Sequence, residues 1–171
     1  DVLHTSPTLA VEIDRYLPPD TEVYNVVNIR QILNSALVKK VGVDNIRALL
    51  NQNEQVTGIL KDLGLDPLKD VDRIISTGPS TGEQDKGLVI VHGRFDVDRF
   101  RARAKKEAKD NQGVVKPVKI AGEEWYEGVI SDANVSLFVG FPSDKTILAA
   151  ASKDYLGDAL KVKPTDKAIL K

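Results

Sequence analysis

A strand that runs directly into a capped helix, over residues 86–100 (KGLVIVHGRFDVDRF), most constrains how this chain can fold. Residues 88–91 form a continuous aliphatic run, which is typical of a strand covered on both faces. Asp96 follows at the position of a helix N-cap, whose carboxylate accepts hydrogen bonds from unpaired backbone N–H groups. Phe95 and Phe100 flank it at the spacing of a hydrophobic staple. The segment therefore predicts helices packed on a sheet.

The remaining segments give the order β-α(α)-β-β-α-β-β-β-β-α. Strands are expected over residues 23–29, 70–76, 88–91, 114–120, 124–130, 135–141 and 146–151, and helices over residues 32–42, 44–63, 97–109 and 152–160. The part up to residue 120 matches the split β-α-β arrangement of a ferredoxin-like fold. The predicted fold class is thus α+β, with a ferredoxin-like βαββαβ core, additional antiparallel β-hairpins and a C-terminal helix.

Turn residues mark the expected boundaries of this domain. Residues 1–22 are rich in turn formers and end in Pro-Pro-Asp, so we expect them to be an extended lead-in. Residues 23–162 are expected to form a single α+β domain. Pro164 is followed by a new helix-cap pattern, which predicts that residues 163–171 are the truncated start of a following segment. A signal peptide before residue 1, continuation past residue 171 and the oligomeric state all stay open.

The composition argues against several classes of site. The chain has no cysteine and two histidines, which excludes thiolate ligands and makes a transition-metal site improbable, so no metal or cofactor is predicted. Its net charge of −1 argues against bulk attraction to nucleic acid. No apolar run approaches the roughly 20 residues of a membrane-spanning helix, and no membrane insertion is predicted within this segment.

RNA binding is the activity that the predicted topology brings to mind, and the central strand argues against it. Lys86-Gly87 matches the start of the RNA-binding strand pattern of RRM domains. The positions that would stack on bases are filled by Leu88, Ile90 and Gly93, which bury well and stack poorly. We therefore predict no nucleic-acid partner.

Three other features are candidate contacts for a ligand or partner. Trp125-Tyr126 is an adjacent aromatic pair that could line a groove, although strand alternation puts the two rings on opposite faces and favours core packing. Arg99 and Arg103 belong to a basic helix that could meet phosphate or an acidic partner, and a solvated helix face is the favoured alternative. His92 could be a general base, but a histidine hydrogen-bonded at a strand end is favoured.

Paired carboxylates recur along the chain, and each pair has a local structural role. They lie at a strand start, at a helix cap and in a hairpin turn. Acid–base catalysis requires two carboxylates that converge in one pocket. We therefore predict no catalytic residue, and the candidate ligand or partner surface consists of Trp125, Tyr126, His92, Arg99 and Arg103.

Residues 70–75 (DVDRII) and 86–96 (KGLVIVHGRFD) resemble exported bacterial proteins of unknown function. In those proteins a strand that leads into a Gly-Arg-Phe-Asp helix start recurs. The resemblance implies a location in the periplasm or outside the cell, with a cytoplasmic location still open. It implies no activity and no functional residues.

These observations predict a non-enzymatic α+β binding or structural domain of a larger, exported bacterial protein, in contact with a protein or a small-molecule ligand. One alternative is an ACT-like small-molecule-sensing module, because ferredoxin-like sheets often pair and bind ligands at the seam. Another is a hydrolase-type enzyme that uses Glu123, Glu124 and Glu127. A pocket that holds His92 with a carboxylate within hydrogen-bond reach would overturn the non-enzymatic prediction.

Overall fold

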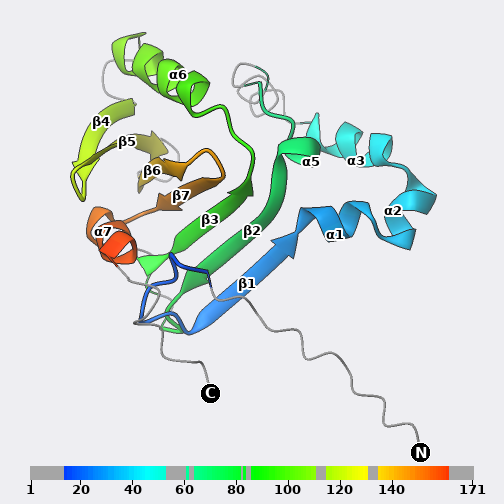
Figure 1. Ribbon diagram of the computed structural model, residues 1–171, viewed down its shortest axis with the longest axis horizontal. Coiled ribbons are helices and arrows are strands. Elements are labelled where there is room, and N and C mark those ends of the chain that lie inside the picture. Colours follow the sequence, from blue (N-terminus) through cyan, green and yellow to red (C-terminus); the bar gives the residue numbers. More distant parts are fainter. Residues whose placement is uncertain are drawn as a thin grey trace, which may run out of the picture.

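The computed structural model describes residues 14–52, 61, 64–81, 83, 86–110, 115–130 and 135–161. Within these residues a seven-stranded sheet has the order β1-β2-β3-β7-β6-β5-β4 (Figure 1). The strands are β1 (Val23–Asn28), β2 (Val71–Gly78), β3 (Leu88–Gly93), β4 (Val115–Ile120), β5 (Glu123–Ile130), β6 (Val135–Ser143) and β7 (Thr146–Ala150). The helices are α1 (Ile29–Leu33), α2 (Ala36–Val41), α3 (Val43–Leu50), α5 (Pro67–Asp70), α6 (Val97–Asp110) and α7 (Lys153–Lys161). The predicted α+β class is confirmed.

The predicted ferredoxin-like core is not confirmed, because β1 pairs directly with β2, whereas a split β-α-β unit has another strand between its first and second strands. A β-α-β crossover needs a helix long enough to carry the chain back along the sheet. Between β1 and β2 the described helices α1, α2, α3 and α5 have 5, 6, 8 and 4 residues. At about 1.5 Å per residue, such helices are much shorter than a six-residue strand of roughly 20 Å. The chain enters β2 at the end of the sheet where it leaves β1, with Asn28 opposite Arg73.

The strand-to-helix segment folds as its sequence predicts. The backbone N–H of Arg99 donates to Oδ1 of Asp96 over 3.0 Å, so Asp96 caps α6. The rings of Phe95 and Phe100 meet edge to face with their centroids 6.3 Å apart, which is the predicted staple. The cap and the staple fix the angle at which the chain leaves β3 and enters α6.

One face of the sheet, called the packed face below, holds the core. Ile75, Leu88, Ile90 and Leu148 from the neighbouring strands β2, β3 and β7 are almost fully buried there, against Tyr155 and Leu156 of α7 and against residues 16–17. Residues 14–22 therefore differ from the extended lead-in expected over residues 1–22. Tyr16 and Leu17 lie among turn formers, where no periodicity shows that they are buried. Residues 1–13 and 163–171 lie outside the described part.

The described residues cover the opposite face of the sheet only in part. Helix α6 lies next to β4 (Figure 1), where Lys105 is 3.8 Å from Glu124 of β5. Its Phe100 contacts Phe141 of β6, with ring centroids 5.1 Å apart. Valines of β1 and β3 on the same face are exposed. The expectation that residues 88–91 are covered on both faces is therefore wrong for Val89, because α6 turns toward β4 instead of lying over β3.

Candidate functional site

A polar cluster surrounds His92 at one end of the packed face. Arg73, His92 and Thr146 lie opposite one another in β2, β3 and β7, so their side chains share a face. Nε2 of His92 is hydrogen-bonded to Oδ2 of Asp14, and Thr146 Oγ1 lies 3.4 Å from His92 Nδ1. An Nη of Arg73 is 3.7 Å from the same Asp14 oxygen. The cluster therefore joins three strands to the segment that precedes β1.

The carboxylate of Asp14 is held in its charged form. Only 2% of this side chain is exposed, and burial alone would raise its pKa. Hydrogen bonds from His92 and from the backbone N–H of Tyr16, together with the charges of His92 and Arg73, outweigh burial and lower the pKa below its usual value. Asp14 is thus a buried anion whose partners favour its ionised form.

The order Thr146–His92–Asp14 resembles a nucleophile, base and acid arrangement. Such a relay needs space for a substrate beside the hydroxyl group. Thr146 is 5% exposed. The two cavities that the structure describes are lined by other residues. A pocket that holds His92 beside a carboxylate would overturn the non-enzymatic prediction. The carboxylate is present, since Asp14 is hydrogen-bonded to His92. Neither of these two cavities is lined by His92.

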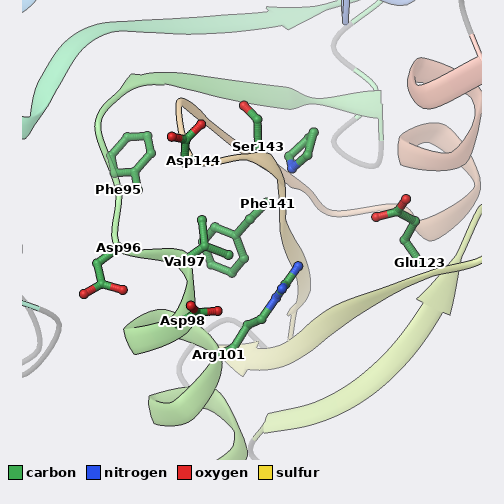
Figure 2. Close-up of a pocket in the computed structure, with 10 residues that line it drawn as sticks. Phe95, Asp96, Val97, Asp98, Arg101, Glu123, Phe141, Ser143 and Asp144 are labelled. Atoms are coloured by element: carbon green, nitrogen blue, oxygen red, sulfur yellow. The ribbon is translucent and has the colours of Figure 1, made fainter.

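The first cavity, of about 440 Å³, lies at the start of α6 (Figure 2). Phe95 and Phe141 form its apolar wall, and Arg101 lies between several carboxylates. The lining residues are Phe95, Asp96, Val97, Asp98, Arg101, Glu123, Phe141, Pro142, Ser143 and Asp144. Asp96 already caps the helix. The excess of acids over the single arginine makes this cavity suited to a cationic group.

The second cavity, of about 550 Å³, lies beside residues 18–20 and α7. Tyr155 lines it and donates its hydroxyl to Asp20 Oδ1 over 3.1 Å. Burial, the charge of Asp20 and this hydrogen bond raise the pKa of Tyr155. A phenol with a raised pKa stays protonated and neutral, so here it acts as a hydrogen-bond donor that ties α7 to the segment before β1.

The three glutamates of the hydrolase alternative do not converge. Glu123 lines the first cavity. Glu124 accepts the hydroxyl proton of Tyr126 over 2.8 Å, and Glu127 accepts from the Ser136 hydroxyl over 2.8 Å. Because alternate residues of a strand point to opposite faces, Glu124 and Glu127 lie on opposite sides of the sheet. The structure therefore gives these carboxylates separate partners.

Trp125 and Tyr126 are core residues on opposite faces of β5. Trp125 is 3% exposed and packs on the packed face, against Gly140 of β6. Tyr126 is 5% exposed, and burial together with the hydrogen bond to Glu124 raises its pKa to about 12. Neither ring lines the suggested groove, and the favoured alternative of core packing is confirmed.

The two arginines on α6 have partners within the protein. Arg103 forms an ion pair with Glu107 one helical turn further on, at 2.7 Å. The guanidinium of Arg99 lies against Gly64. The five candidate residues thus do not make one site: His92 and Trp125 lie on the packed face, Tyr126 on the opposite face, and both arginines on α6.

Sequence reasoning missed a surface that we call the open face. Its members lie opposite one another across four strands: Val23, Asn25 and Val27 of β1, Ile74 and Ser76 of β2, Val89 and Val91 of β3, and Ile147 and Ala149 of β7. The exposed fractions of Val23, Val27 and Val89 are 42%, 45% and 36%. None of the nine side chains carries a charge. The signal in the sequence is the run of aliphatic residues on both faces of β3. The same run is typical of a strand covered on both faces, so it does not identify an exposed surface.

No family model, no curated protein and no solved structure matches this chain. The resemblance to exported bacterial proteins stays a prediction. Among the described residues no helix is long and apolar enough to cross a membrane. The same residues hold no group of three or more potential metal ligands.

Proposed function

We propose that this chain is a non-enzymatic binding domain that takes a protein partner on the open face. The observation that carries the proposal is the absence of charge from all nine side chains of this surface, seven of which are aliphatic. Soluble proteins rarely leave contiguous apolar patches of this kind to water, and such patches commonly mark protein interfaces.

The shape of the open face favours a protein over a small ligand. Small molecules bind in concave sites that bury most of their surface. The open face is the surface of a sheet, and neither described cavity includes any of its nine residues. A partner with an apolar sheet face or the apolar side of a helix would match it, since both present flat or gently curved aliphatic surfaces.

The proposal keeps the expected exported location and drops the ACT-like alternative. A larger, exported bacterial protein, in the periplasm or outside the cell, remains proposed on the resemblance alone, and fractionation of cells that express the full-length gene tests it. The ACT-like alternative rested on a ferredoxin-like sheet, so we do not carry it further.

A photo-reactive amino acid placed at position 89 tests whether the open face meets a protein. The matched control carries the same amino acid at Val43 of α3, which is 40% exposed against 36% for Val89. We expect cross-linking at position 89, in cells that contain the natural partner, to yield one discrete adduct that the control position does not give. The same adducts from both positions, or none from either, would contradict a binding role for this face.

A further inference from the structure

The two edges of the sheet are built differently. Strand β4, at one end, carries exposed Lys116, Pro117 and Lys119. Lysines, and a proline that lacks an N–H, are devices that keep an edge strand from pairing with another strand. Strand β1, at the other end, has the sequence VYNVVN, with no charge and no proline, and five of its six residues are exposed. In the part of the chain that the structure describes, one edge is thus protected and the other is open to pairing.

An unprotected edge presents a row of backbone N–H and C=O groups that can pair with another extended strand. Within the described residues β2 is the one strand that pairs with β1. We propose that β1 pairs antiparallel with β1 of a second copy of this chain, across a twofold axis at Asn25. The proposal rests on the contrast between the edges and is independent of what binds the open face.

The sequence of β1 is complementary to itself in this register. Asn25 lies opposite Asn25 of the second copy, and a side-chain amide can both donate to and accept from another amide. Val23 then faces Val27, and Tyr24 faces Val26, which are favourable cross-strand pairs. Beyond the strand, Glu22 falls opposite Asn28, so no like charges meet. Since opposite residues of an antiparallel pair share a face, the two open faces become one continuous surface.

Mass measurement of the full chain at rising concentration tests the pairing. We expect light scattering after gel filtration to approach about twice the 18.7 kDa mass of one chain. Asn25→Lys and Asn25→Asp should each be monomeric, because they set like charges against each other at the axis, and a mixture of the two should recover the dimer. Asn51→Lys, at an exposed site after α3, should remain dimeric.

A cysteine cross-link tests the same register without a charge. The chain has no cysteine, so Asn25→Cys carries a single thiol. Opposite residues of antiparallel strands have Cα atoms about 4.5–5.5 Å apart, within the range of a disulfide. We expect mild oxidation to link Asn25→Cys into a covalent dimer and to leave Asn51→Cys monomeric. A chain that stays monomeric at every concentration, a dimer that persists in Asn25→Lys, or equal cross-linking of the two cysteine variants would overturn the proposal.

Discussion

Asp14 and His92 lie 78 positions apart in the chain and share a hydrogen bond at the end of the packed face. The bond attaches the segment before β1 to β3, an interior strand of the sheet. Leu17 and Tyr16 of the same segment are buried against the core. Arg73 of β2 places a guanidinium beside the same carboxylate. The Asp14–His92 pair therefore holds in place a segment whose sequence contains no regular pattern. Removing the pair should lower the free energy of unfolding.

Asp14→Asn should destabilise the fold by about 1–3 kcal/mol, because it leaves Arg73 and His92 without their anion in a largely buried site. Urea denaturation measures the change. Asp158→Asn is the control, since it removes an exposed pair with Lys161, and such pairs contribute at most about 1 kcal/mol. Equal stability of Asp14→Asn and the unmodified chain would show that the cluster does not hold the segment in place.

The same pair predicts how stability depends on pH. The pKa of Asp14 is lower in the folded chain than its usual value of 3.8. A lowered folded pKa stabilises the protein above the unfolded pKa, and this contribution is lost as pH falls from 3.8 through the folded value. The stability difference between the unmodified chain and Asp14→Asn should be smaller at about pH 3 than at about pH 5. A difference that grows over this interval would contradict the assigned direction.

Gly140→Ala should be strongly destabilising, because an added Cβ would stand 2.0 Å from an atom of the Trp125 ring. Overpacking of this kind costs about 1–3 kcal/mol or more. Gly157→Ala is the matched control, since its Cβ would meet Ile120 at an ordinary 3.7 Å. Thermal unfolding, followed by the fluorescence of the single tryptophan, compares the two variants. Similar melting temperatures would mean that Trp125 has room to move.

Asp96→Ala should cost about 1 kcal/mol through loss of the α6 cap, whereas Asp96→Asn should cost much less because its oxygen can still accept from Arg99 N–H. Chemical denaturation of both variants makes the comparison. If alanine and asparagine are equivalent at this position, the staple of Phe95 and Phe100 alone fixes the start of the helix.

The sequence is a good guide to the elements and a poor one to their arrangement. Cap, staple and periodicity are local, so α6 and the two hairpins are found nearly as expected. The strand order depends on whether the segments between β1 and β2 carry the chain across one face of the sheet. Short helices with caps at Asn28 and Ser35 have the same apolar periodicity as one longer helix, so the sequence does not distinguish the two cases. Asp14 could not be found as the partner of His92, because nothing local links them. The aliphatic run around Val89 predicts cover on both faces, because the sequence pattern of a strand does not show whether one of its apolar faces is left exposed.

Val89→Lys gives the most direct measurement of what the open face does. Once the partner has been identified by cross-linking, its dissociation constant and the free energy of unfolding are measured on the same variant, with Val43→Lys as control. Because a charge would enter the centre of an apolar interface, we expect binding to weaken at least about tenfold. The free energy of unfolding should change by no more than about 0.5 kcal/mol, as for other surface substitutions. An unchanged dissociation constant would contradict the proposal that the open face is the binding surface.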